Sequence, residues 1–172
     1  MTRAIAAVVG FSAFALFVLL VHAPESPTLL PDTIFYGVLV LHTYYSVRFF
    51  SQLIPQNAWQ IGADVLLVAI YFALALSLGE RFRFLFLVLC LFAVATLKYI
   101  PSLGRDDLNA ILRRKLKSLL SGIALTIYTI IVAFFVDPTI AAWFITGVYT
   151  FFSLHIMFVS KMYDMNMLAK PE

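Results

Sequence analysis

The apolar residues of this chain fall into six blocks of about 20 residues, separated by short polar segments. A helix of about 20 apolar residues crosses the roughly 30 Å hydrocarbon layer of a bilayer. Charged residues make up only 12% of the 172 residues, about half the share usual in soluble proteins. The pattern therefore predicts an all-α, polytopic membrane protein, with the whole chain forming one six-helix transmembrane domain.

The turn-forming segments between the blocks set the expected span boundaries, each to within about 2–4 residues. Val21-His22-Ala23 loosely resembles a signal-peptide cleavage site, but the long apolar block before it favours a true first span. We expect crossings over residues 4–21, 33–53, 59–78, 82–100, 119–136 and 140–160.

The positive charges predict the orientation of these spans. With the N-terminus in the cytoplasm, only Arg81 and Arg83 of the 12 Lys and Arg residues fall on the outer side. Cytoplasmic loops carry an excess of Lys and Arg. Both termini are therefore expected in the cytoplasm, in a plasma membrane or a bacterial inner membrane.

A basic segment, residues 106–118, lies between the fourth and fifth blocks. Arg113, Arg114 and Lys117 fall on one side of a helix and leucines on the other, while Lys115 falls among the leucines. This pattern predicts an interfacial helix whose cations, Lys115 included, bind anionic phospholipid at the inner leaflet or a protein partner. A single helix continuous with the fifth span is the alternative.

Five ionisable residues lie within the predicted spans, where such groups are costly and need a reason. Arg48, Asp64, Lys98 and His155 are expected in one layer of the inner leaflet, with His42 nearer the midplane. Aspartate is too short to reach the headgroups, so Asp64 needs a partner. An ion pair with Arg48 or Lys98 is one interpretation, and a proton- or cation-responsive site is the other.

His42 is followed one helical turn later by Tyr45. A histidine that is hydrogen-bonded inside the bundle is one interpretation, and a proton relay is the other, because histidine titrates near neutral pH. We expect no haem between His42 and His155, since their depths differ, and no zinc-ligand spacing is present. No cofactor, metal or nucleic acid is therefore expected.

Other polar and aromatic residues have more ordinary interpretations. Thr146, Thr150 and Ser153 share one face of the sixth block, where hydroxyl groups favour close helix packing or, alternatively, line a path for a solute. Four aromatic residues near span ends are expected to anchor the helices at the membrane interface: Tyr36, Trp59, Tyr99 and Trp143.

One short region resembles a known family. Arg48-Phe49-Phe50, followed by Pro55, Asn57 and Asp64, resembles the junction between the second and third helices of voltage-sensor domains over about 20 residues. The fourth block has no arginine at every third position, and the Asp137-Pro138 link is too short for a selectivity filter. Voltage gating and potassium selectivity are therefore not expected.

Two classes of function fit the sequence. The first is an oligomeric channel- or transporter-like protein for protons, ions or a small solute, supported by the charges within the predicted spans. The second is a non-catalytic assembly or regulatory subunit that binds a protein partner or anionic lipid through the basic segment. No metal motif, nucleophile elbow or paired acidic motif is present, so an enzyme is not expected.

Overall fold

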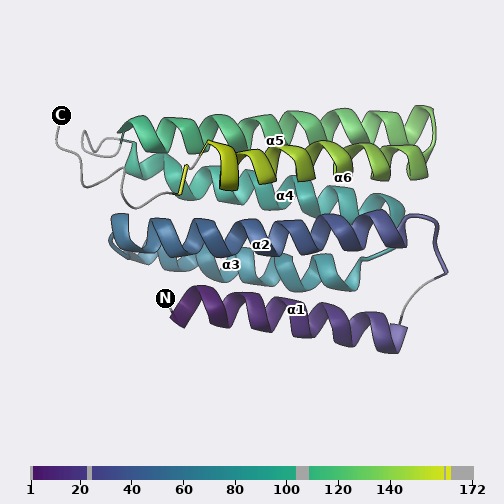
Figure 1. Ribbon diagram of the computed structural model, residues 1–172, viewed down its shortest axis with the longest axis horizontal. Coiled ribbons are helices and arrows are strands. Elements are labelled where there is room, and N and C mark those ends of the chain that lie inside the picture. The colour runs from purple at the N-terminus through teal and green to yellow at the C-terminus, as the bar shows by residue number, and fades with distance from the viewer. Residues whose placement is uncertain (1, 23–24, 104–108, 161, 164–172) are drawn as a thin grey trace.

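The computed structural model describes residues 2–22, 25–103, 109–160 and 162–163, and within these ranges every regular element is helical (Figure 1). A 3₁₀ turn, η1 (Ile100–Ser102), follows α4, and a π-helical turn, η3 (His155–Val159), follows α6. The long helices are α1 (Thr2–His22), α2 (Leu29–Leu53), α3 (Ala58–Leu76), α4 (Arg81–Tyr99), α5 (Asn109–Phe135) and α6 (Pro138–Leu154).

The predicted breaks between spans are where the helices begin and end. Asn57 caps α3 by accepting the backbone N–H of Gln60 at 2.8 Å. Asp137 caps α6 by accepting the N–H groups of Thr139 and Ile140, and Pro138 occupies the first turn. Gly79 adopts a φ of 80° in the turn between α3 and α4, a conformation that favours glycine.

Five of the long helices are long and apolar enough to cross a membrane: Ala4–Val21, Ala58–Leu76, Phe82–Ser102, Ala110–Phe135 and Pro138–Val159. Large apolar side chains on their outward faces are exposed, among them Phe17, Val65, Phe86, Ile131 and Phe151. Apolar faces that find no partner within the protein are what lipid-facing helices present. These features support a multi-pass membrane protein.

α2 is as long as the other helices but less apolar, and it is not among the five. Its 25 residues span about 37 Å at 1.5 Å per residue. Asp32, Tyr36 and Ser46 lower its hydropathy, yet all three side chains are buried inside the bundle. Much of the polarity of α2 is therefore directed inward, while Arg48, Ser51 and Gln52 near its end are exposed.

The six helices form a closed ring. Each packs chiefly against two neighbours, in the spatial order α1, α2, α6, α5, α4, α3 and back to α1. Figure 1 shows α4, α5 and α6 side by side, α2 and α3 next to them, and α1 on the far side of that pair. We call the end where α1 and α5 begin and α2 and α4 end the terminal end. The opposite end holds the turns after α1, α3 and α5.

The half of the ring toward the opposite end is filled by side chains. Phe35 of α2 packs against Phe84 of α4 and Tyr149 of α6, with ring centroids 5.8 and 4.5 Å apart. Leu74 and Ile145 are fully buried in the same half. Asp32 accepts the N–H of Gly79 at 3.2 Å, and Thr146 donates to the carbonyl of Pro31 at 3.0 Å. These contacts close this end of the ring.

The structure corrects two expectations from the sequence. The predicted interfacial helix 106–118 is not a separate element: residues 109–118 are the first turns of α5, because Leu112, Leu116 and Leu119 pack into the bundle instead of facing a membrane surface. Residues 106–108 lie outside the described residues. Of the four predicted interfacial aromatics, Trp59 and Trp143 are exposed, whereas Tyr36 and Tyr99 are buried.

Candidate functional site

A cavity of about 600 Å³ occupies the half of the ring toward the terminal end. Cavities of about 300–1,000 Å³ are typical of sites for small organic ligands. The wall is mostly apolar, and every long helix contributes to it. One lining residue from each, in chain order, is Phe11, Ser46, Asp64, Lys98, Lys115 and Ser153.

The cavity has an open end and a closed end. Ser51, Gln56 and Lys117 line it near the terminal end and are exposed, and so are Val68 of α3 and Phe152 of α6 farther along the bundle. In the other direction it ends at the packed half of the ring, where Phe35 and Phe84 are fully buried. Within the described residues the cavity therefore reaches the surface in the half toward the terminal end and does not extend into the opposite half.

His42 of α2 is the centre of a polar cluster in the cavity wall. Its Nδ1 lies 3.2 Å from the hydroxyl of Ser153 on α6, and its Nε2 lies 2.7 Å from the hydroxyl of Tyr163. The imidazole also stacks on Tyr149, with centroids 6.2 Å apart. These partners fix the ring plane and leave one nitrogen as donor and the other as acceptor in the neutral tautomers.

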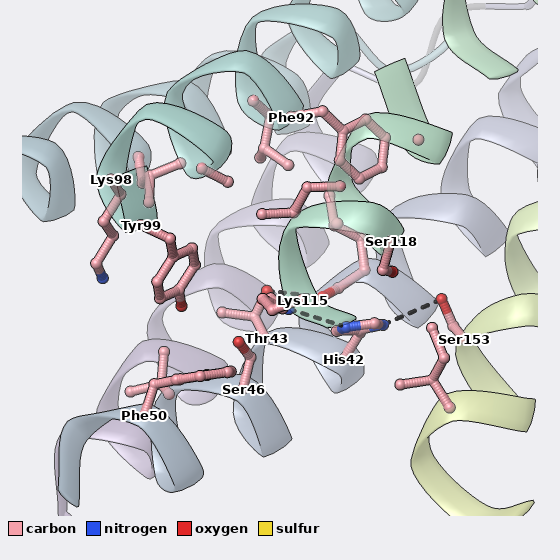
Figure 2. Close-up of a pocket in the computed structure, with 18 of the residues that line it drawn as sticks. His42, Thr43, Ser46, Phe50, Phe92, Lys98, Tyr99, Lys115, Ser118 and Ser153 are labelled. Atoms are coloured by element: carbon pink, nitrogen blue, oxygen red, sulfur yellow. Dashed lines mark hydrogen bonds between the residues drawn. The ribbon is translucent and has the colours of Figure 1, made fainter. Parts of the chain in front are cut away.

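Lys115 of α5 joins this cluster from the other side of the cavity (Figure 2). Its Nζ donates to the Tyr163 hydroxyl at 2.9 Å and lies 3.5 Å from Nε2 of His42. It also lies over the rings of Phe50 and Tyr163, 5.8 and 5.4 Å from their centroids. The residue is 5% exposed. Among the described residues no carboxylate lies within 4 Å of this ammonium group.

Asp64 of α3 and Lys98 of α4 form an ion pair at the cavity wall. The Asp64 side chain is 45% exposed and that of Lys98 only 15%, so the pair bridges the cavity and the surface. Gln60 donates from its side chain to the carbonyl of Lys98 at 3.0 Å and ties the same two helices together. The pair lies near Lys115, whose environment includes the charge of Lys98.

The remaining residues singled out from the sequence lie elsewhere. Arg48 is exposed at the end of α2, and Lys98 takes the place beside Asp64 that Arg48 was also expected to fill. His155 is exposed and stacks on Phe151, 6.4 Å away. Tyr45 packs edge-on against Phe158, outside the cavity wall. The expected single layer of charges is therefore split between the cavity and the outer face.

The basic segment is divided in the same way. Arg113, Arg114 and Lys117 are exposed, so this face of α5 is cationic, whereas Lys115 points into the ring. Hydroxyl groups on α6 also separate: Ser153 binds His42, while Thr146 binds the backbone of Pro31.

Two contributors to the site, Tyr163 and Ser46, were not identified from the sequence. Tyr163, just after η3, bridges His42 and Lys115, and nothing in its sequence neighbourhood marks it. Tyr99 and Tyr163 both lie beside the hydroxyl of Ser46. For Lys115 a signal existed: its place among leucines on the helical period indicates an inward side chain.

The arrangement offers hydrogen-bond donors and positive charge, and within the described residues no group of three His, Cys, Asp or Glu side chains could hold a metal ion. No protein-family model, curated protein or solved structure matches this chain.

Proposed function

We propose that the protein crosses the membrane six times, with both termini in the cytoplasm, and carries a small solute or ion through the ring of helices. In this arrangement α2 crosses the membrane in addition to the five more apolar helices. Its polar side chains Asp32, Tyr36 and Ser46 are buried inside the ring and do not face lipid. Arg48, Lys98, Arg114 and Lys117 then lie at the cytoplasmic end, and the Glu80–Arg83 pair lies at the outer end.

The observation that carries the proposal is a cavity lined by all six helices, which reaches the surface in the half toward the terminal end and is closed toward the opposite end. A site that is accessible from one side is what alternating access requires of a carrier. The packed outer half, with Phe35 against Phe84, favours a carrier over a continuously open channel. The polar cluster around His42 and Lys115 supplies groups that a solute or proton can engage.

Flux measurements in proteoliposomes test the proposal. Vesicles that enclose the dye pyranine report proton movement, and exchange of radiolabelled acetate, choline and glycerol reports small solutes of each charge. We expect at least one flux above that of empty vesicles. We further expect His42→Gln and Lys115→Met to lower it about tenfold, which corresponds to 1.4 kcal/mol in the barrier.

Two further variants make the test specific. Asp64→Asn removes the carboxylate beside Lys98, and we expect a smaller loss because Asp64 is paired with Lys98 and no hydrogen bond joins it to His42 or Lys115 among the described residues. Arg114→Met removes a charge from the exposed face of α5 and should leave the flux unchanged. If none of these four probes and no anionic amphiphile such as decanesulfonate crosses faster than in empty vesicles, the transport proposal is wrong.

A second candidate rests on the exposed cations of α5. Arg114 and Lys117 lie near the terminal end, where they can bind anionic phospholipid headgroups or an acidic partner, each contributing about 1 kcal/mol near a charged surface. Binding of this kind supports an assembly or regulatory subunit. Association of the protein with further copies of itself is also a prediction. Stabilisation by phosphatidylglycerol over phosphatidylcholine that disappears in Arg114→Gln/Lys117→Gln, with no flux in liposomes, would favour this function.

A further inference from the structure

The contents of the cavity wall restrict what the cavity can hold. Its buried polar groups gather around His42, Lys115 and the Asp64–Lys98 pair, while most of the rest of the wall is apolar, including Phe11, Leu39 and Leu91. A ligand that matches this wall has one polar end and an apolar body. A small hydrated ion would leave most of the apolar surface without a partner.

The charge of the wall restricts the polar end further. Asp64 and Lys98 neutralise each other, which leaves the Lys115 ammonium as the uncompensated charge of the described cavity lining away from the mouth. At the mouth, Lys117 adds a second positive charge. A buried ammonium group surrounded by aromatic rings and neutral hydroxyls is costly unless an anion accompanies it.

Donors converge at the same point. The Lys115 ammonium carries three N–H groups, of which one is directed to the Tyr163 hydroxyl. Tyr99, close to Lys115, and Ser46, beside Tyr99, add hydroxyl groups within the same cluster. Figure 2 shows Lys115 and His42 meeting in the cavity, with Ser46, Tyr99 and Ser153 around them. Several donors and one positive charge form a suitable receptor for an oxyanion headgroup.

We propose that the cavity binds an amphiphile that has a single anionic oxygen-rich headgroup and an apolar tail, with Lys115 as the counter-charge for the headgroup. The tail lies against the apolar wall toward Leu39 and Leu91, and the headgroup lies toward Lys115 and His42. This inference rests on the proposed carrier function, because it names the class of solute for the same cavity.

The first test measures binding to the wild-type protein in phosphatidylcholine nanodiscs. Equilibrium dialysis compares three radiolabelled probes with the same apolar tail: decanesulfonate, which stays anionic, neutral decanol and cationic decyltrimethylammonium. Empty nanodiscs correct for partition into lipid. We expect saturable binding of decanesulfonate and at least about tenfold weaker binding of the other two. Equal binding of decanol and decanesulfonate would overturn the inference without any variant.

The second test locates the headgroup. Lys115→Met removes the charge but keeps an unbranched chain, and we expect it to weaken decanesulfonate binding about tenfold or more, while leaving decanol binding unchanged. Arg83→Met, which removes an exposed charge at the opposite end of the bundle, is the control and should bind like the wild type. Lys115→Arg keeps the charge and should retain most of the preference for the anion. Unchanged decanesulfonate binding in a folded Lys115→Met protein would also overturn the inference.

Two sources could supply such an amphiphile. If phosphatidylglycerol in the nanodiscs displaces decanesulfonate, the ligand class includes an anionic membrane lipid, and if it does not, the site takes single-chain amphiphiles. Both results support the binding of an anionic headgroup with an apolar tail in the cavity. Anion-selective binding without flux of decanesulfonate in liposomes would keep this inference and contradict the carrier function. Flux of another solute without anion-selective binding would keep the carrier function and contradict this inference.

Discussion

Asp32 is a carboxylate buried at the opposite end of the bundle, just before the segment 33–53 that is expected to cross the membrane. It is 2% exposed, and burial raises its pKa to about 7 from an ordinary value of 3.8, although the Gly79 N–H and the Thr28 hydroxyl partly offset this. Folding therefore favours the protonated form. The contribution of this group to stability is fully present below about pH 4 and is lost as the pH rises through about 7.

We predict that the protein in detergent becomes less stable between about pH 4 and pH 7 because of this residue, by on the order of 4 kcal/mol at most. Asp32→Asn keeps an oxygen that accepts the Gly79 N–H but cannot ionise, so it should remove this contribution. The measurement is the difference in unfolding midpoint between the two proteins across this pH range. Glu25→Gln, an exposed change at the same end, should leave the wild-type slope intact.

Single residues of the candidate site differed in how well they could be predicted. Asp64 could be identified because it is a carboxylate inside an apolar block. Of its two expected partners, Arg48 and Lys98, the structure pairs it with Lys98. Lys115 was grouped with its exposed neighbours, although its helical position already separated it from them. Tyr163 could not be predicted, because its role depends on how the chain after α6 returns to His42 and Lys115.

At the scale of helices, α5 approaches α4 closely at Gly122. A Cβ atom placed there would lie 2.9 Å from the Phe92 ring, which lines the same cavity. We predict that Gly122→Ala lowers stability by about 1–3 kcal/mol, as crowding in a packed core does, unless Phe92 rotates into the cavity. Reduced decanesulfonate binding together with an unchanged unfolding midpoint would reveal that rotation.

Gly147 provides the matched control for this prediction. It lies inside α6, and no atom lies within 4 Å of an added Cβ. Gly147→Ala should therefore be neutral or raise stability by about 0.5–1 kcal/mol, because alanine loses less backbone entropy in a helix. Unfolding midpoints of both variants in the same detergent test the comparison. A similar loss in both would show that close packing at Phe92 is not the cause.

Helices were predictable where sequence pattern and environment agree. Apolar blocks and turn residues located α1, α3, α4 and α6 closely, because lipid demands both length and apolarity. The start of α5 was misjudged because an amphipathic basic segment fits an interfacial helix and a buried helix end equally well. Low apolarity usually indicates a helix that faces water. In α2 it has another cause, because the polar side chains of Asp32, Tyr36 and Ser46 are buried inside the ring.

At the scale of the whole molecule, the number of long helices in the described residues followed from the sequence, but their order around the ring did not. The order α1, α2, α6, α5, α4, α3 depends on contacts between residues far apart in the chain, such as Phe35 with Tyr149 and His42 with Ser153. The cavity is a consequence of that order. Whether the cavity can be reached from one side of the membrane only can therefore be examined directly with a chemical accessibility test.

Ser46 is suited to that test because it is buried in the cavity wall beside the His42 cluster. In a Cys90→Ala background, which removes the single native cysteine, Ser46→Cys should react with membrane-impermeant thiosulfonates only from the side of the termini. The anionic reagent should react faster than the cationic one, because Lys115 and, at the mouth, Lys117 make the cavity positive. Glu25→Cys, exposed at the opposite end, should react only from the other side and report vesicle orientation. Equal reaction of the Ser46→Cys thiol from both sides would instead indicate a continuous channel, and a faster cationic reagent would contradict the inferred charge of the cavity.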